Sequence, residues 1–355
     1  MNPKVSIIVP IYNVEKYLKR CLDSLVSQRL RDIEIIAVND GSTDNSLLIL
    51  KEYAKQDERI IVIDKENGGV SSARNKGLEK VRGSYIGFVD PDDWVDEHMY
   101  EQLYQMVLVE NADISMCSYT REFGKHSKVK NFPLPEKVTY TNEEVQLKMM
   151  RRLIGPLNEE IANPELLDAW GTVWSKIYRT EVIKENHIVF TDLNKIGTNE
   201  DSLFNIQAFY YANKFVFTNK PYYHYWRVNE NSVTTGYKTE LIEKWSTLFS
   251  EIESFLEEND LNDQYYEALN NRICLNTLGL GLNEISKANQ SSILVKIRNL
   301  DTILNHRTIK RSFEHFDLQH FSLLWRMFYF CAKTRKALSF FLLLMSIEWL
   351  RKVVR

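Results

Sequence analysis

Four short apolar runs, each followed by polar residues, constrain the fold of this chain more than any other feature. They are rich in β-branched residues and cover residues 5–10, 33–38, 60–63 and 85–89. Runs of this length and composition are typical of buried strands. After the first run, apolar residues recur every three or four positions from Val14 to Val26, which predicts a helix with Asn13 as its N-cap.

Helical patterns also follow the second and third runs, over residues 47–54 and 71–81. Strands that alternate with helices of this length predict right-handed βαβ units and a mostly parallel sheet flanked by helices. The expected fold class is therefore α/β, with a Rossmann-like nucleotide-binding half over residues 1–115. With 355 residues, the chain has the length of about two domains.

The patterns change beyond this half. Residues 121–140 are polar and contain Pro133 and Pro135, so we expect a loop or an insertion there. Apolar residues spaced by three or four, such as Trp245 and Leu248, predict a helical domain over residues 241–318.

The last segment, residues 319–355, mixes aromatic and basic side chains. From His320 onward it has seven basic residues and one acid, so it carries a charge of +6 against −9 for the remainder. Its longest uncharged run, residues 337–347, is far shorter than the roughly 20 residues needed to span a bilayer. We expect this tail to lie in the membrane interface against anionic headgroups. The alternative is a last helix pair docked on the protein.

The overall composition disfavours several classes of protein. A net charge of −3 gives no reason to expect nucleic acid as a partner. The four cysteines are scattered, so neither a zinc site nor a disulfide framework is expected, and a reducing cytoplasm is the simplest compartment. The N-terminus lacks the pattern of a signal peptide, so we expect no export by that route.

Polar residues at the ends of the four runs are the first candidates for a site, because ligands bind at the carboxyl ends of strands in an open α/β sheet. These ends carry residues 10–13, 39–42, 66–69 and 90–93. Asp40-Gly41 alone is common turn chemistry, although the carboxylate could accept the N–H of a pyrimidine base. Tyr12 could pack in the protein, or its ring could lie against that base.

The acidic turn from Asp90 to Asp93 is a stronger signal, since three carboxylates within four residues repel one another unless they are solvated or bind a cation. Mg²⁺ or Mn²⁺ typically takes one or two carboxylates and completes its shell with water and phosphate. The alternative is a solvated acidic turn before a helix. Arg74 follows a helix start with two glycines, where it could bind a phosphate or a sugar hydroxyl, or form a surface salt bridge.

Residues 5–12, 38–44, 67–75 and 83–94 together resemble the inverting glycosyltransferase family 2, of the type that makes bacterial surface polysaccharides. The resemblance implies a GT-A fold, a nucleotide-sugar donor and a Mn²⁺ or Mg²⁺ ion. By position, it implies that Pro10 and Tyr12 flank the base, Asp40 recognises it and Arg74 approaches the phosphates. Asp90 would contact the ribose or the metal, and Asp92 is the best metal ligand. The donor site implied by the resemblance also includes Asn13 and Gly69.

A looser match over residues 174–179, 199–204 and 222–227 implies that residues 116–240 form the acceptor side. There Asp201 would be the general base that takes the proton of the acceptor hydroxyl, with Glu200 as the alternative. The family often has Gly before this pair, where this chain has Asn199. His224 and Arg227 could meet the acceptor or a phosphate, although segments rich in Tyr and Trp are more often core.

The function implied by the resemblance is inverting transfer of a hexosyl or N-acetylhexosaminyl group from a UDP-sugar to a glycan or polyprenyl-linked acceptor. It would act at the inner face of the cell membrane, in the synthesis of surface polysaccharide. The alternative is a catalytically inactive nucleotide-sugar-binding scaffold of the same fold, which predicts damaged acidic motifs. Asp40, Asp90, Asp92 and Asp201 are all intact. The sequence leaves the sugar, the linkage and any oligomeric state open.

Overall fold

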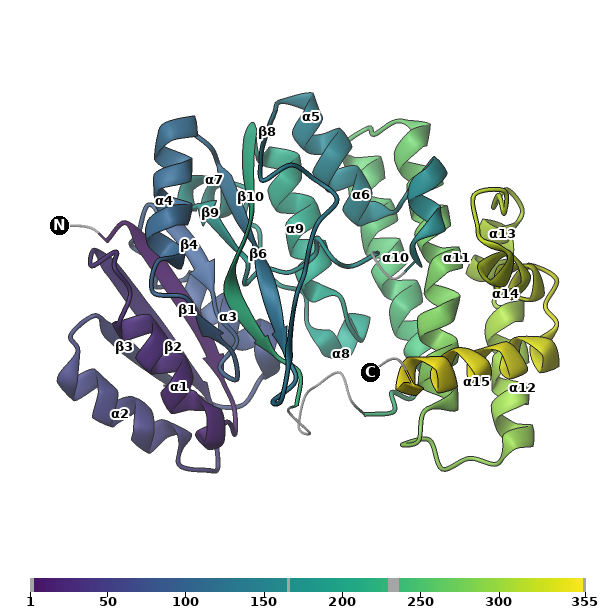
Figure 1. The fold of residues 1–355 in the computed structure, drawn as a ribbon, viewed down its shortest axis with the longest axis horizontal. Coiled ribbons are helices and arrows are strands. Elements are labelled where there is room, and N and C mark those ends of the chain that lie inside the picture. The colour runs from purple at the N-terminus through teal and green to yellow at the C-terminus, as the bar shows by residue number, and fades with distance from the viewer. Residues whose placement is uncertain (1–2, 165–166, 229–235, 354–355) are drawn as a thin grey trace. The chain divides into compact units, whose positions relative to one another are not determined.

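The computed structural model describes residues 3–164, 167–228 and 236–353. The chain divides into two compact units. The sheet unit comprises Met1–Met150, Gly171–Leu193 and Asn199–Glu230, and the helical unit comprises Arg151–Trp170, Asn194–Thr198 and Asn231–Arg355 (Figure 1). The four-part division expected from the sequence stays a prediction.

Ten strands, counted over the described residues, form one sheet in the sheet unit. They are β1 (Val5–Ile11), β2 (Ile33–Asp40), β3 (Ile60–Lys65), β4 (Tyr85–Phe88), β5 (Trp94–Val95), β6 (Ile114–Glu122), β7 (Ser127–Val129), β8 (Lys137–Thr141), β9 (Lys176–Arg179) and β10 (Lys214–Trp226). Their order is β3-β2-β1-β4-β9-β6-β10-β5, with β7 paired to β6 and β8 paired to β10.

The first four strands are the four apolar runs of the sequence, and they pair in parallel. This part of the sheet confirms the α/β fold class. β1 and β2 are buried along their whole length, as parallel strands covered on both faces should be. The expectation of a buried strand at residues 60–63 is wrong in part, because β3 lies at the sheet edge and most of its residues are only partly buried.

Beyond β4 the sheet is mixed. β9 runs antiparallel to both of its neighbours, β4 and β6, whereas β10 runs parallel to β6. The loop or insertion expected over residues 121–140 is wrong in part, since this segment contains the end of β6, all of β7 and most of β8, joined by residues 123–126 and 130–136 outside the strands. Polar residues suit β7 and β8 because these short strands are largely exposed.

The helices of the sheet unit are α1 (Glu15–Val26), α2 (Ser46–Gln56), α3 (Gly69–Leu78), α4 (Met99–Glu110), α5 (Glu143–Val145), η1 (Gln146–Met150), α7 (Thr180–Glu185) and α9 (Glu200–Tyr211). The strand order reverses direction after β3, so right-handed crossovers place α1 and α2 on one face and α3 on the other. α3 packs closely on β1, where a Cβ atom at Gly77 would lie 2.6 Å from Ile8. The reversal makes a switch point between β1 and β4, where α/β sheets bind ligands.

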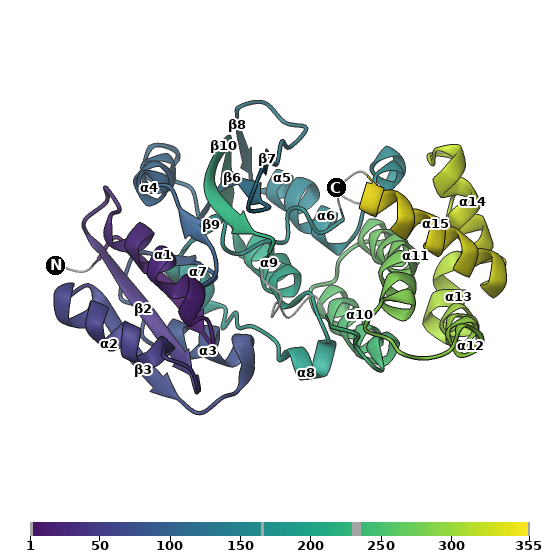
Figure 2. The same ribbon diagram turned by 60° about the horizontal axis from the view of Figure 1, so that its bottom comes forward.

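The helical unit contains α6 (Arg151–Ile154), η2 (Asn158–Ala162), α10 (Leu241–Glu258), α11 (Asp263–Ile285), α12 (Ile293–Asn305), α13 (Arg307–Phe313), α14 (Leu323–Lys333) and α15 (Ala337–Val353), while α8 (Leu193–Ile196) begins on the last residue of a sheet-unit segment. The helices expected over residues 241–318 are therefore present. α11 is central, since it packs against α6, α10, α12, α13, α14 and α15 (Figure 2). Its buried Arg272 donates to the Leu153 carbonyl at 2.8 Å and ties that segment to α11.

The tail forms the pair of helices α14 and α15. Phe328, Tyr329 and Phe340 are fully buried, and α15 packs against α11, α12 and α14. The described residues thus form the docked helix pair that was the alternative to an interfacial segment. Within them, no helix combines the length and the apolar character that crossing a bilayer requires. Of the basic tail residues, the side chains of Arg351, Lys352 and Arg355 lie outside the described part.

Candidate active site

The residues that follow β1 form the open edge of the candidate site. Pro10 is the last but one residue of β1 and pairs with Val38, while the Tyr12 ring is half exposed just beyond the strand. Asn13 is not the N-cap of α1, which is Val14. It adopts a left-handed φ of 50°, and its Oδ1 accepts a hydrogen bond from the Thr43 amide at 2.7 Å. Its side chain therefore joins the loops after β1 and β2, which is why it does not cap the helix.

Asp40, at the end of β2, holds the start of α3. Its buried carboxylate accepts hydrogen bonds from the amides of Gly68 at 3.0 Å and Gly69 at 2.7 Å, and pairs with Lys65 at 2.5 Å. Gly69 has a φ of 86°, a conformation that residues with a side chain rarely adopt. In this structure Asp40 thus bonds to the protein, and its contact with a base stays a prediction.

Arg74 gathers three carboxylates from distant parts of the chain. Its Nη1 atom lies 2.6 Å from Oδ1 of Asp201 and 3.2 Å from Oε1 of Glu200, and its Nη2 atom lies 2.9 Å from Oδ1 of Asp90. The alternative of a surface salt bridge is wrong, because the Arg74 side chain is only 3% exposed. Burial lowers the pKa of the guanidinium, but the three carboxylates outweigh burial and raise it.

Asp201 lies in the first turn of α9, inside the sheet unit. Burial raises the pKa of its carboxyl to about 7, with the charges of Glu200 and Asp90 adding to the rise and Arg74 opposing it. The Val173 amide also donates to this carboxylate. Asn199, the N-cap, has a φ of 69°, which glycine adopts freely and asparagine tolerates. The departure from the family's Gly at this position is therefore accommodated by the backbone.

The acidic turn splits its three carboxylates between different partners. Asp93 points inward, where its side chain accepts a hydrogen bond from the Tyr223 hydroxyl at 2.7 Å and from the Trp226 amide at 2.7 Å. Burial, with Asp92 and Asp90 nearby, raises the pKa of Asp93 well above its usual range. Asp93 therefore clamps β10 to the turn, whereas Asp90 pairs with Arg74 and Asp92 is half buried.

Arg20, on α1, supports this turn and had no signal in the sequence. Its Nη2 atom donates to the Asp92 carbonyl at 2.7 Å. Its guanidinium lies over the rings of Trp94, at 3.9 Å from the centroid, and Trp226, at 4.7 Å. Burial lowers the pKa of this guanidinium, and Asp93 and Asp92 oppose the shift. A planar cation in this position fixes the backbone that carries Asp92.

The two candidate acceptor residues on β10 differ in their surroundings. His224 pairs with Trp94 in the sheet, and the two rings stack with centroids 5.0 Å apart. Its Nδ1 atom lies 2.8 Å from Oε1 of Glu122, so His224 sits beside the acidic turn. Arg227 is exposed just past β10, where its Nη1 atom donates to the Tyr225 hydroxyl at 2.9 Å.

The acidic turn fits a divalent metal only in part. Across the described residues, no group of three or more His, Cys, Asp or Glu side chains is placed to hold a metal ion by itself. Asp93 is held inward by its hydrogen bonds, and Asp90 pairs with Arg74. Asp92 and Asp90 stay the predicted ligands. One or two carboxylates fit Mg²⁺ or Mn²⁺ only if water and substrate phosphate complete the shell.

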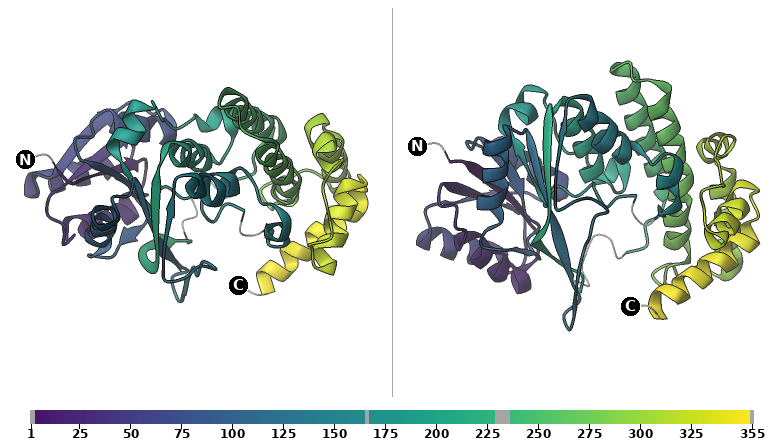
Figure 3. Two further views of the ribbon diagram at one scale, coloured as in Figure 1. Left: turned by 90° about the horizontal axis from the view of Figure 1, so that it is seen from above. Right: turned by 45° about the horizontal axis from the view of Figure 1, so that its top comes forward.

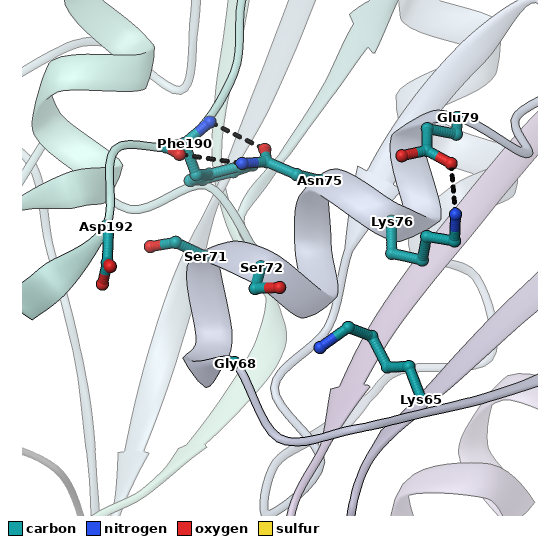
Figure 4. A pocket seen from close by; sticks show the side chains of 9 residues that line it. All are labelled: Lys65, Gly68, Ser71, Ser72, Asn75, Lys76, Glu79, Phe190 and Asp192. Atoms are coloured by element: carbon teal, nitrogen blue, oxygen red, sulfur yellow. Dashed lines mark hydrogen bonds and ion pairs between the residues drawn. The ribbon is translucent and has the colours of Figure 1, made fainter.

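A pocket of about 390 Å³ lies on α3 (Figure 4). Side chains of α3 line it together with Lys65, Phe190 and Asp192. Asn75 forms two hydrogen bonds of 2.8 Å with the Phe190 backbone, which fixes the wall of the pocket. Its lining includes Lys65 and Gly68. It includes none of the four residues that we call the Arg74 cluster, which are Arg74, Asp90, Glu200 and Asp201.

Comparison with known proteins gives concordant matches. Residues 6–163 match the model of the family described as Glycosyl transferase family 2. EpsH of Bacillus subtilis (strain 168), which is named a glycosyltransferase, is 32% identical over 302 residues, or 85% of this chain and 83% of that protein. The glycosyltransferase EpsJ of the same organism is 35% identical over 326 residues, or 91% and 90%.

A solved structure shares the fold. The crystal structure of S. aureus TarS 1-349 in complex with UDP-GlcNAc matches with a TM-score of 0.66 at 21% sequence identity. The match covers 98% of this chain and 92% of that one. The expected GT-A fold with a C-terminal helical region is thereby confirmed.

Proposed function

The chain belongs to glycosyl transferase family 2, and on this premise we propose that it transfers a sugar from a UDP-sugar to a hydroxyl group of a glycan or lipid-linked acceptor, with inversion. The observation that carries this proposal is the contact of Arg74 with Asp90 on one side and with Asp201 on the other. Through these contacts the donor-side carboxylate of Asp90 and the candidate base Asp201 lie beside the same Arg74 guanidinium.

The donor site would lie along the carboxyl ends of β1, β2 and β4. Tyr12 offers a half-exposed ring for a base, and Gly69 is the first residue of α3. Pro10, Asn13, Asp40 and Asp90 complete this edge. The fold shared with a structure that contains UDP-GlcNAc supports a UDP-sugar of the hexosyl or N-acetylhexosaminyl type.

The reaction would be a single displacement. The acceptor oxygen attacks the anomeric carbon and loses its proton to a carboxylate oxygen of Asp201, while the bond from the anomeric carbon to the diphosphate oxygen breaks. A carboxyl group with a pKa of about 7 is well matched to proton transfer near neutral pH. Arg74 would hold Asp201 in position, and Glu200 is the alternative base.

We assign a Mn²⁺ or Mg²⁺ ion to Asp92, with Asp90 as the second protein ligand. A bound divalent ion would supply positive charge against the diphosphate of the donor. The support is that Asp90 and Asp92 lie in the turn after β4, at the strand end where the family resemblance implies a metal. Arg20 would keep the Asp92 backbone in place for this role.

The acceptor and the location rest on the family resemblance. We propose a glycan or a polyprenyl-linked glycan as the acceptor, at the cytoplasmic face of the cell membrane, in the synthesis of surface polysaccharide. His224, beside the acidic turn, and Arg227, at the end of β10, are the candidate acceptor contacts.

Thermal unfolding with a panel of nucleotides tests the donor site, because a ligand that binds the folded state raises its stability. UDP and UDP-sugars with Mn²⁺ should raise the melting temperature more than GDP or ADP, and Asp92→Asn should remove the Mn²⁺-dependent part. Asp32→Asn, at an exposed pair with Lys4, is the matched control. Equal effects of all nucleotides, or none, would refute the UDP-sugar assignment. Binding without sugar transfer to any acceptor would favour the inactive scaffold.

A further inference from the structure

The outer face of α15 is apolar although no described residue of the helical unit covers it. Leu338, Leu342, Met345 and Trp349 recur at intervals of four, three and four, so they form one stripe on the helix. These side chains are 59%, 58%, 47% and 63% exposed.

The opposite face of α15 is the one that packs on the helical unit. Phe340, Phe341, Leu344 and Ile347 are buried there, against α11, α12 and α14. α15 is thus apolar on both faces, and it lies along the outer side of the helices it packs on (Figure 3). A helix that is apolar all round is normally covered on all sides, so the exposed stripe indicates a missing contact surface.

Basic residues lie just before α15 in the chain. The turn between α14 and α15 carries exposed Arg335 and Lys336, and Lys333 precedes it. Over residues 321–350 there are four basic residues and one acid, Glu348. An apolar face with an excess of positive charge matches the surface of an anionic lipid bilayer, in which acyl chains lie beneath negative headgroups.

We propose that α15 docks on anionic lipid through the stripe Leu338, Leu342, Met345 and Trp349, with Arg335 and Lys336 against the headgroups. This assigns the membrane contact to one face of a docked helix, whereas the sequence alone predicted that the whole tail lies in the membrane interface. The large aromatic residues Phe328, Tyr329 and Phe340 hold the helix pair to the protein and stay buried. The proposal rests on the membrane location in the proposed function and deepens it, since it assigns a surface of the helical unit and no residue of the active site.

Sedimentation of the full chain with vesicles tests this surface. We expect binding to vesicles of phosphatidylcholine with phosphatidylglycerol, little binding to phosphatidylcholine alone, and weaker binding at high salt. The variant Leu342→Gln/Trp349→Gln should reduce the partition coefficient at least tenfold. Leu48→Gln/Leu108→Gln removes two apolar side chains of similar exposure elsewhere and should leave binding unchanged.

A second pair of variants tests the charge. Arg335→Gln/Lys336→Gln should weaken binding to the anionic vesicles by about fivefold for each basic residue removed. Lys51→Gln/Lys55→Gln, which removes two exposed lysines of α2, is the matched control. Sugar transfer to an acceptor free in solution should be unchanged in all four variants, so a failure of the proposed function is distinguishable from a failure here.

Three outcomes would overturn the proposal. The first is no binding of the unsubstituted chain to anionic vesicles. The second is binding that Leu342→Gln/Trp349→Gln leaves intact. The third is a concentration-dependent dimer that these substitutions disperse without any vesicle binding, which would make the stripe a contact between two copies of the chain.

Discussion

The Arg74 guanidinium lies 2.6 Å from the Asp201 carboxylate, and both side chains are largely buried in the sheet unit. Arg74 comes from α3, in the part of the chain that carries the donor motifs, and Asp201 comes from α9, in the part expected to bind the acceptor. The same guanidinium also pairs with Asp90, so one side chain joins the donor-side carboxylate to the candidate base.

The substitution Arg74→Met should destabilise the fold strongly. It leaves three carboxylates together without their cation, and breaking a buried ion pair costs about 3–5 kcal/mol. The loss in the free energy of unfolding should shrink as the pH falls, because protonation of the carboxylates removes their repulsion. Urea unfolding of both proteins at several pH values measures this loss in the free energy of unfolding.

The matched control for this substitution is Arg29→Met, which breaks the exposed pair of Arg29 with Glu97. Exposed pairs are screened by solvent, so this variant should lose much less stability. Equal losses in the two variants would show that the Arg74 cluster contributes no more than a surface contact.

The rate of sugar transfer should rise with pH through about pH 7. A base acts only when deprotonated, and burial raises the pKa of Asp201 to about 7. A profile of kcat/KM against pH measures this acidic limb. Glu200→Gln removes one of the charges that raise the pKa, so the limb should move to lower pH. A limb that stays in place, or a flat profile, would argue against Asp201.

Lys176 needs a separate control, because burial lowers the pKa of this β9 lysine to about 7, with Asp201 opposing the shift. Its ammonium donates to the Thr172 carbonyl. Lys176→Met should retain an acidic limb in the profile if the limb belongs to Asp201. Loss of the limb in this variant, with the fold intact, would assign the titration to Lys176.

The substitution Arg20→Lys should impair the Mn²⁺ dependence of sugar transfer more than it lowers the free energy of unfolding. Lysine keeps the charge but loses the planar stack on Trp94 and Trp226. We expect the Mn²⁺ concentration for half-maximal transfer to rise about tenfold, which corresponds to roughly one lost hydrogen bond to the Asp92 carbonyl. Titration of activity with Mn²⁺ measures the shift, with Arg31→Lys, at an exposed position, as control. An unchanged Mn²⁺ concentration for half-maximal transfer would mean that Arg20 packs against the two tryptophans without affecting the metal site.

Local patterns were sufficient to predict the first four strands and their helices. β-branched runs and helical spacing are set by neighbours in sequence, and the rule that ligands bind at strand ends then places Asp40, Asp90 and Arg74 at one edge. The contact of Arg74 with Asp201 was beyond this reasoning, since it depends on how α9 packs more than a hundred residues later. The resemblance to a family supplied Asp201 as a candidate.

The failures have a common cause, which is tertiary contact. Asn13 has the side chain of a good N-cap, but a hydrogen bond to the Thr43 amide holds it in a left-handed conformation. β8 carries no apolar run because none of its residues is fully buried, so its sequence predicts a loop. Arg20 has no distinguishing neighbour in sequence, and only the fold brings it to Asp92.

The central claim is that Asp201 is the base of a sugar transfer, and one pair of measurements on Asp201→Asn tests it most directly. Titration calorimetry should show that the variant binds the UDP-sugar donor within about twofold of the unsubstituted protein. Single-turnover transfer should fall by about 10²- to 10⁴-fold, the usual contribution of a general base. Asp32→Asn should change neither quantity. Transfer by Asp201→Asn at the unsubstituted rate, with donor binding intact, would contradict the claim.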